Sequence, residues 1–220
     1  MNQEARIGIL LVNLGTPDSA DVGDVRRYLR EFLSDPRVID IHPVARWLLL
    51  NLVILPFRPQ KSAAAYKKVW TAEGSPLLVY SQQLRDALAS EFQGTAEVEL
   101  AMRYGQPSIS GALKNFETKG IHRIIVFPLF PQYASASSGS ALQQTLAELG
   151  DFTSVPDVQI VGEFYSDPGY IHAVAELARQ SVAAADHVLI SFHGLPERHI
   201  RNGDVSGSHC LVGSDCCDAI

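Results

Sequence analysis

The chain has 220 residues, 46% of them hydrophobic, which is enough for one sizeable α/β domain or two small ones. Its 18 lysines and arginines against 24 aspartates and glutamates give a net charge of −6, so the charge balance argues against a nucleic-acid partner. The first six residues are polar, no small-residue cleavage site follows them, and the three cysteines form no disulfide framework, so we expect a cytoplasmic protein.

Four apolar stretches predict β-strands, and each runs into an unusual loop. A fifth stretch, residues 158–164, gives a weaker signal. The four are residues 7–13, 97–102, 123–130 and 187–192.

Helical patterns lie between these strands. Residues 21–35 place their apolar side chains on one face and their arginines on the other. Residues 81–92 predict a helix with Ser81 as its N-cap, and residues 108–120 predict one that ends on a glycine. Residues 170–185 predict a further helix.

Strands that alternate with helices and are almost entirely apolar indicate a Rossmann-like parallel sheet with helices on both faces. Ligands of such sheets bind beyond the carboxyl ends of the strands. We therefore expect the loops that begin at Leu14, Arg103, Pro131 and His193 to converge on one cleft. No glycine-rich phosphate loop follows the first strand, which disfavours a nucleotide-binding version of the fold.

The longest apolar run covers residues 47–57 and is interrupted by Asn51. It is far shorter than the roughly 20 residues that a membrane span needs. The run is either a buried helix or loop, or an apolar lip that contacts a membrane surface or a hydrophobic substrate.

Several residues at the strand ends carry chemistry. His193 either caps a strand or, as a neutral imidazole, binds a metal ion or accepts a proton near neutral pH. Arg103 pairs either with a local carboxylate or with a substrate carboxylate. Phe130 and Tyr133 either pack in the core or offer flat faces to a planar ligand.

The cysteines lie close together near the end of the chain. They are either incidental surface thiols or ligands of zinc or an iron–sulfur cluster, which would need a fourth ligand from elsewhere. The three are Cys210, Cys216 and Cys217.

Five motifs resemble, in order, the motif series of the ferrochelatase family, over about residues 7–204. They are LLVNLGTPD, EGSPLLVYS, MRYGQPSI, FPLFPQYASASSGS and SFHGLPERH. The resemblance implies a chelatase-like fold and a lyase that inserts Fe²⁺ into protoporphyrin IX to give protohaem, the last step of haem biosynthesis. The alternatives are a coproporphyrin ferrochelatase, another tetrapyrrole chelatase, and a non-catalytic porphyrin-binding lobe.

The resemblance also implies roles for residues. His193 matches the active-site histidine, which either binds iron or takes pyrrole protons. Tyr66 and residues 47–57 match the lip of the cleft, which contacts the bilayer in membrane-associated members. A leucine at position 14 cannot ligate iron, whereas coproporphyrin-specific members carry a tyrosine there, so protoporphyrin IX is the expected substrate. Substrate-binding positions are Leu14, Ser75, Arg103, Tyr104, Phe130 and Tyr133.

Two departures from the family pattern lead to further expectations. Residues 1–200 correspond to the first of two similar lobes, and the second lobe, with a glutamate that faces the histidine, is absent. We therefore expect the 220-residue chain to be inactive by itself. Residues 201–220 resemble the start of a cysteine-rich insertion, in which Cys210, Cys216 and Cys217 would hold a [2Fe–2S] cluster.

Overall fold

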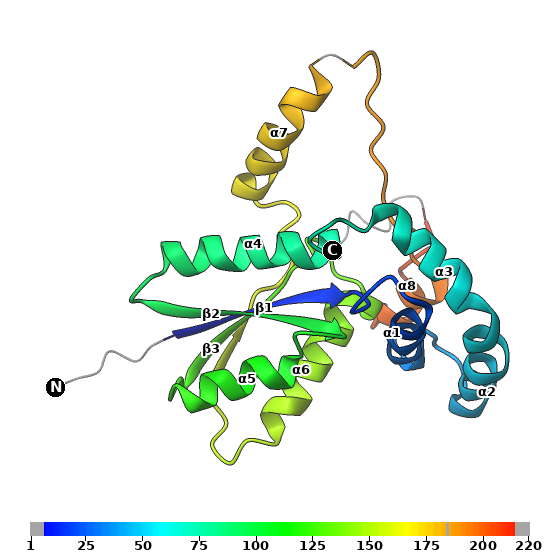
Figure 1. The fold of residues 1–220 in the computed structure, drawn as a ribbon, viewed down its shortest axis with the longest axis horizontal. Helices are drawn as coiled ribbons and strands as arrows, with labels where there is room; N and C mark the ends of the chain where they lie inside the picture. Colours follow the sequence, from blue (N-terminus) through cyan, green and yellow to red (C-terminus); the bar gives the residue numbers. More distant parts are fainter. Residues whose placement is uncertain (1–6, 184, 214–220) are drawn as a thin grey trace. The chain divides into compact units, whose positions relative to one another are not determined.

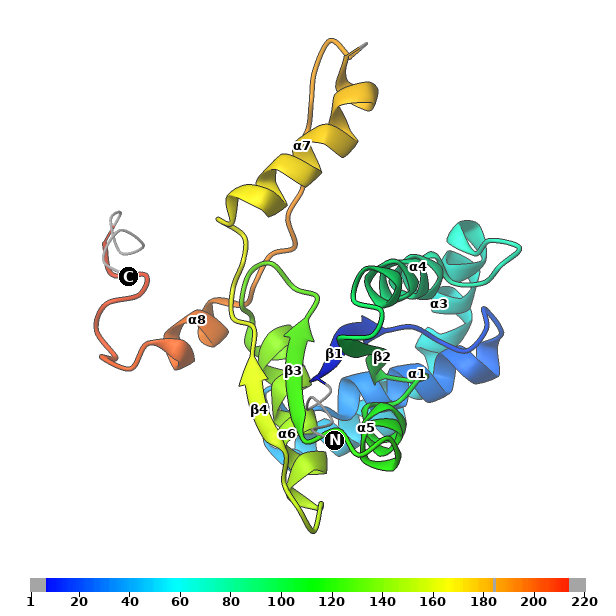
Figure 2. The same cartoon turned by 90° about the vertical axis from the view of Figure 1, so that its left-hand side faces the viewer.

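Four parallel strands form one sheet in the computed structural model, which describes residues 7–183 and 185–213. The strands lie in the order β2-β1-β3-β4, so the chain places β2 on one side of β1 and returns to the other side for β3 (Figure 2). The predicted parallel α/β fold is confirmed. The strands are β1 (Ile7–Gly15), β2 (Ala96–Tyr104), β3 (Arg123–Pro128) and β4 (Asp157–Ile160).

Helices cover both faces of this sheet (Figure 1). Leu11 points to the face covered by α4 (Pro76–Glu91), whereas Leu10 and Val12 point to the face covered by α5 (Ile109–Thr118) and α6 (Ser140–Gly150). Successive strand residues face opposite sides, so a strand buried on both faces is apolar at nearly every position. The continuous apolar runs in the sequence have this cause.

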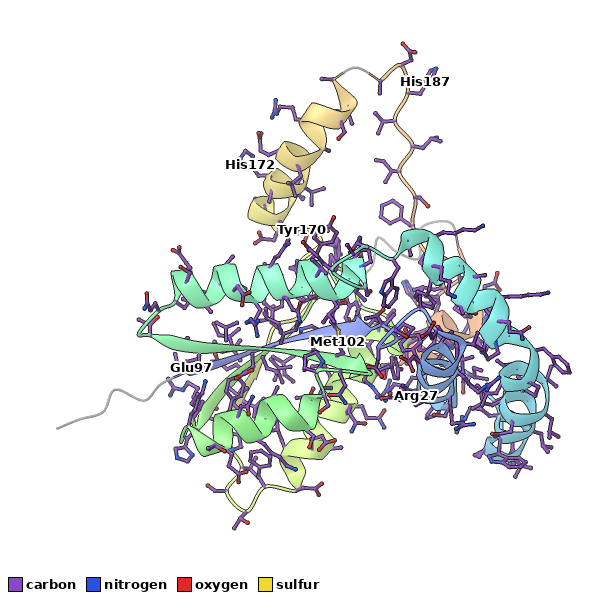
Figure 3. The ribbon with its side chains drawn as sticks, viewed as in Figure 1. Arg27, Glu97, Met102, Tyr170, His172 and His187 are labelled. Atoms are coloured by element: carbon purple, nitrogen blue, oxygen red, sulfur yellow. The ribbon has the colours of Figure 1, made fainter. Side chains whose placement is uncertain are left out.

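A third apolar cluster lies beyond the carboxyl ends of β1 and β2, where a group of helices packs (Figure 1). Val25 and Leu29 of the first helix are buried there against Leu50, Leu55 and Ala63, as the apolar face of residues 21–35 predicts. In Figure 3, Glu97 and Met102 mark the direction of β2 toward this cluster. The helices are α1 (Val22–Ser34), α2 (Pro43–Leu48), the π-helix η1 (Leu49–Ile54) and α3 (Leu55–Val69).

The apolar run over residues 47–57 is helical and is buried on only one side. Leu50 and Leu55 are each 4% exposed, while Trp47 is 59% and Phe57 is 72% exposed. One face of the run therefore packs in the core, as a buried helix would, and the other presents apolar side chains outward. Contact of that outer face with a membrane surface or a hydrophobic substrate stays a prediction. Within the described residues, no helix has the length and apolar character needed to cross a bilayer.

The predicted start of α4 is wrong. Ser81 lies inside the helix, and the residue that precedes its first turn is Ser75, followed by Pro76. Proline is favoured in the first turn because the helix does not use that N–H, so Ser75-Pro76 is the stronger start signal. The Ser81 hydroxyl donates to the Leu77 carbonyl at 2.7 Å and accepts from Asn13 Nδ2 at 3.0 Å.

The chain divides into two compact units, and the residues after Gly162 form the second one, separate from the sheet domain. The second unit contains α7 (Pro168–Val182) and α8 (Glu197–Gly203). The prediction of a strand at residues 187–192 is wrong, because the described part of the chain offers this segment no strand partner and Leu189 is 95% exposed. An apolar run predicts burial, but a strand also needs a neighbour for its backbone hydrogen bonds.

Candidate active site at the carboxyl edge of the sheet

The ends of β1 and β2 approach each other closely at Gly15. Gly15 is the register partner of Tyr104 and has a φ of +114°. A Cβ atom at this position would lie 1.9 Å from the Tyr104 carbonyl oxygen, so only glycine fits. Leu14, immediately before it, is half-buried and packs against the helical cluster beyond the sheet.

Ser75 joins the start of α4 to this strand end. The Thr16 hydroxyl donates to Ser75 Oγ at 2.8 Å, and both residues are buried. The bond between Asn13 and Ser81 makes a second link between the same two elements. The GTP and GSP motifs, about sixty residues apart in the sequence, therefore meet at one edge of the sheet.

A buried carboxylate, Asp35, organises the end of β2. Its Oδ2 accepts hydrogen bonds from Arg103 Nη2 at 2.7 Å, Tyr104 Oη at 2.8 Å and Ser140 Oγ at 2.5 Å. Its Oδ1 accepts the backbone N–H of Arg37 at 2.7 Å. Asp35 thus connects the end of α1, the end of β2 and the start of α6.

Charge and burial set the protonation of this cluster. Burial acts to raise the pKa of Asp35, but the hydrogen bonds from Ser140, Arg37 and Tyr104 and the charge of Arg103 outweigh it, so its pKa lies below the ordinary value. Burial also raises the pKa of the Tyr104 hydroxyl, which stays protonated and can donate to Asp35. Asp35 is therefore ionised at neutral pH and compensates the charge of Arg103.

Of the two interpretations of Arg103, its observed partner is the local carboxylate. Arg103 Nε also donates to Ser140 Oγ at 2.7 Å, and the guanidinium lies 4.4 Å from the centre of the Tyr104 ring. Tyr104 itself is fully buried. Both side chains are therefore held in fixed positions before any ligand arrives.

Tyr133 lies close to the side chain of Arg37, near the Asp35 cluster. A Cβ atom added to Gly139 would lie 2.8 Å from Tyr133 Oη and 3.0 Å from Arg37 Nη1, so both groups lie against this glycine. Gly139 ends the π-helix η2 (Ser135–Gly139), which leads into α6. Tyr133 is 50% exposed, whereas Phe130 is half-buried and packs against the core under α5 and α6.

A cavity of about 480 Å³ opens nearby, where β2 ends and α5 begins. Of the six predicted substrate-binding residues, only Arg103 lines this cavity; the other five are Leu14, Ser75, Tyr104, Phe130 and Tyr133. The other lining residues include Glu31, Asp35, Ser108, Gln143 and Glu148.

His193 belongs to the second unit, where it is exposed. Its Nδ1 lies 2.6 Å from the Gly194 carbonyl oxygen. Because a carbonyl can only accept a hydrogen bond, this contact favours the Nδ1–H tautomer and leaves the Nε2 lone pair for a proton or a metal ion.

Of the three cysteines, Cys210 lies in the described part of the chain, while Cys216 and Cys217 lie outside it. The Cys210 backbone N–H donates to the Asp204 carboxylate at 2.9 Å, and hydrogen bonds from Ser206, Cys210 and His209 lower the pKa of Asp204. Among the described residues, no three histidine, cysteine or acidic side chains gather as metal ligands do. The described residues alone therefore do not form a cluster site.

Asp35 and Arg37 are the residues of this edge that sequence reasoning missed. They follow α1 in the segment Ser34-Asp35-Pro36-Arg37, where an aspartate before a proline is ordinary turn chemistry. Their partners, Arg103 and Ser135, lie 68 and 98 residues away. The sequence offers no signal for such distant contacts.

Comparison with known proteins identifies the family of this chain. Residues 6–214 match the family model described as Ferrochelatase. A curated relative named ferrochelatase from Legionella pneumophila (strain Paris) is 47% identical over 211 residues, which are 96% of this chain and 62% of the relative. One of the same name from Coxiella burnetii (strain CbuK_Q154) is 43% identical over 213 residues, 96% of this chain and 59% of the relative. The chain thus spans about three fifths of the length of these relatives, and it belongs to the ferrochelatase family.

Proposed function

We propose that this chain forms the N-terminal lobe of a ferrochelatase, a lyase that inserts Fe²⁺ into protoporphyrin IX. The observation that carries the proposal is the meeting of separate motif segments at one edge of the sheet. Leu14 and Gly15 contact the β2 end, Ser75 bonds to Thr16, and Tyr133 lies beside Arg37, whose backbone binds Asp35. Membership of the ferrochelatase family supports it.

The chemistry of the substrate matches this edge. Protoporphyrin is flat and apolar, with carboxylates along one side, so it needs apolar surfaces for its faces and cationic groups near its rim. Leu14 and Phe130 are half-buried and Tyr133 is half-exposed, so they offer apolar and aromatic surface, and Arg37 lies beside Tyr133. A slot that binds a puckered ring better than a flat one lowers the insertion barrier, because it stabilises the state in which the nitrogen lone pairs point at the metal.

Insertion replaces two pyrrole N–H protons with one ferrous ion, so the site needs a proton acceptor and a path for the metal. His193 is the proposed catalytic residue, either as the acceptor or as a ligand that delivers Fe²⁺ through Nε2. Leu14 offers no axial ligand to iron, which favours protoporphyrin IX over coproporphyrin as the substrate.

The test is an anaerobic assay with protoporphyrin IX and Fe²⁺, followed by the loss of porphyrin fluorescence and the appearance of haem absorbance. We expect residues 1–220 alone to bind the porphyrin without turnover, because the family resemblance places a glutamate on a second lobe. A chimera continued with the remaining part of the Legionella pneumophila relative should turn over, and His193→Ala should abolish that turnover. Failure of residues 1–220 to bind porphyrin would refute the proposal. If the chimera bound porphyrin but did not insert iron, the result would favour the alternative of a non-catalytic porphyrin carrier.

We also propose that residues 1–200 make up the chelatase lobe and that residues 201–220 begin a cysteine-rich insertion. Cys210, Cys216 and Cys217 would be three ligands of a [2Fe–2S] cluster. The chimera, purified anaerobically, should then show visible iron–sulfur absorbance that Cys210→Ser removes. A colourless protein with no bound sulfide would rule the cluster out.

The exposed apolar face of residues 47–57 supports a further proposal, that a cytoplasmic form of the protein touches the membrane surface there. Trp47 and Phe57 protrude from this face. Cosedimentation with phospholipid vesicles should fall when Phe57 is changed to Ser, and it should be unaffected by the same change at Phe92, which is 38% exposed after the end of α4. Equal cosedimentation of both variants with the wild type would contradict the contact.

A further inference from the structure

Two arginines lie at the carboxyl edge of the sheet, and their charges are balanced differently. Arg103 forms an ion pair with Asp35 at 2.7 Å, and the two side chains are 15% and 4% exposed. Because the partner carboxylate is ionised and buried beside it, the positive charge of Arg103 is compensated within the protein. An approaching anion would meet a neutral pair at this position.

Arg37 has no such compensation among the described residues. Its Nη1 donates to Ser135 Oγ at 3.0 Å and its Nε donates to Gln143 Oε1 at 2.5 Å, and both acceptors are neutral. Asp35 binds the backbone N–H of Arg37 rather than its guanidinium. In the part of the chain that the structure describes, Arg37 Nη2 has no hydrogen-bond partner and no carboxylate forms an ion pair with the guanidinium.

The Arg37 guanidinium also lies beside a second donor. Tyr133 Oη and Arg37 Nη1 both approach Gly139, which has no side chain to separate them. Tyr133 is half-exposed, so this corner of the edge is open to a ligand. A guanidinium and a phenol hydroxyl side by side are the donor set that a carboxylate prefers.

We propose that Arg37, together with the Tyr133 hydroxyl, binds a carboxylate on the rim of the porphyrin, and that Arg103 is instead a positioning residue held by Asp35. This inference rests on the proposed function, because it takes a carboxylate-edged porphyrin as the ligand. It assigns the cationic contact to a residue that the sequence motifs do not single out.

Arg37 also links the loop after α1 to the start of α6, so a purely structural role has to be separated from substrate binding. Esterification of the substrate separates them. Protoporphyrin IX and its dimethyl ester share the ring, but only the free acid has carboxylates for Arg37. Loss of a merely structural link would weaken the binding of both porphyrins equally.

The experiment titrates each porphyrin into the 220-residue chain and measures the dissociation constant from the change in Soret absorbance. Arg37→Gln should weaken binding of the free acid about tenfold, which is the loss of one charge-assisted hydrogen bond, and leave the ester unaffected. Arg37→Lys should keep most of the preference for the acid. Arg123→Gln is the matched control, because Arg123 is an exposed arginine at the amino end of β3 and its loss should change neither constant.

Tyr133→Phe removes one hydroxyl from a half-exposed side chain, so it tests the site even if Arg37→Gln does not fold. It should weaken binding of the acid severalfold and leave the ester unchanged. The inference would be overturned if Arg37→Gln and Tyr133→Phe still bound the free acid in preference to the ester as strongly as the wild type does. It would also be overturned if these variants lost affinity for both porphyrins equally. Either result would leave the proposed function standing. A wild-type chain that binds neither porphyrin would overturn the proposed function and this inference with it.

Discussion

Replacement of Asp35 by Asn tests the buried cluster that holds the end of β2. The change keeps the size of the side chain and an acceptor for the Arg37 N–H, but it puts an NH₂ group where Oδ2 accepts from Arg103, Tyr104 and Ser140. Three donors then lose their shared acceptor, and Arg103 is left nearly buried without its counter-charge.

The magnitude follows from that loss. Removing one partner of a buried ion pair costs about 3–5 kcal/mol, because the other charge stays buried and uncompensated. We expect the free energy of unfolding to fall by about 3 kcal/mol, the lower end, since Arg103 keeps its bonds to Ser140. The control is Asp157→Asn, whose partner Arg123 and whose own side chain are 54% and 61% exposed, and which should cost less than about 1 kcal/mol.

Urea unfolding monitored by tryptophan fluorescence is a suitable assay, because Trp47 and Trp70, the two tryptophans of the chain, both lie in the sheet unit. The pKa of Asp35 is lowered in the folded state, so its stabilisation is complete above the ordinary carboxyl value and is lost as the pH falls through the folded value. The gap between wild type and Asp35→Asn should therefore be constant near neutral pH and should close below about pH 4. Equal urea midpoints for Asp35→Asn and Asp157→Asn, or a gap that persists at low pH, would refute this reasoning.

Three other substitutions probe the same edge. Gly15→Ala should lower the free energy of unfolding by more than about 4 kcal/mol, because its Cβ would collide with the Tyr104 carbonyl. The control is Gly94→Ala, which should lower it by about 1–2 kcal/mol, because Gly94 has a φ of +84° but open space around it. Thermal unfolding compares the two variants. Ser81→Ala should lower stability by about 1 kcal/mol, since the Asn13 amide loses its acceptor, and urea unfolding measures this. In an alkaline titration of tyrosinate absorbance, Tyr104 and Tyr28 should ionise only on unfolding, because burial raises the pKa of both hydroxyls. Tyr104→Phe should therefore reduce the amplitude of that late step without removing it, and the free energy of unfolding of the wild type should decline above about pH 10. A tyrosine signal that is already complete before unfolding would contradict the burial of Tyr104.

The strands of the sheet could be predicted because burial on both faces leaves a direct mark on the sequence. Leu10, Leu11 and Val12 are all fully buried, so the run is apolar at every position. The same continuous apolar pattern led to the wrong prediction of a strand at residues 187–192, where apolar residues occur without a paired strand in the described chain. Composition records how apolar a segment is, but it does not record which neighbour supplies its hydrogen bonds.

Local signals also compete with each other. The polar, helix-forming stretch after Ser81 predicts an N-cap at that serine, yet the N-cap is Ser75, about 1.7 turns earlier. Val79 and Tyr80 have low helix propensity, so the sequence gives only a weak helical signal for the first turns of α4. The serine at 81 has a tertiary role instead, as the acceptor for Asn13.

The candidate site was only partly predictable for a related reason. Loops at strand ends identified Leu14, Arg103 and Tyr133, because the carboxyl edge of a parallel sheet collects them. Asp35 and Arg37 follow a helix rather than a strand, and they form hydrogen bonds with partners about 70 to 100 residues away. Contacts of that range are set by the packed fold and leave no periodic pattern.

A crystal structure of the protein with bound metal-free protoporphyrin would test the central claim most directly. We predict a ring whose face lies against Leu14 and Tyr133, with one carboxylate on Arg37 and the His193 imidazole directed at the pyrrole nitrogens. A ring bound in the cavity lined by Ser108 and Glu148, away from the ends of β1 and β3, would contradict the assignment of this edge as the active site.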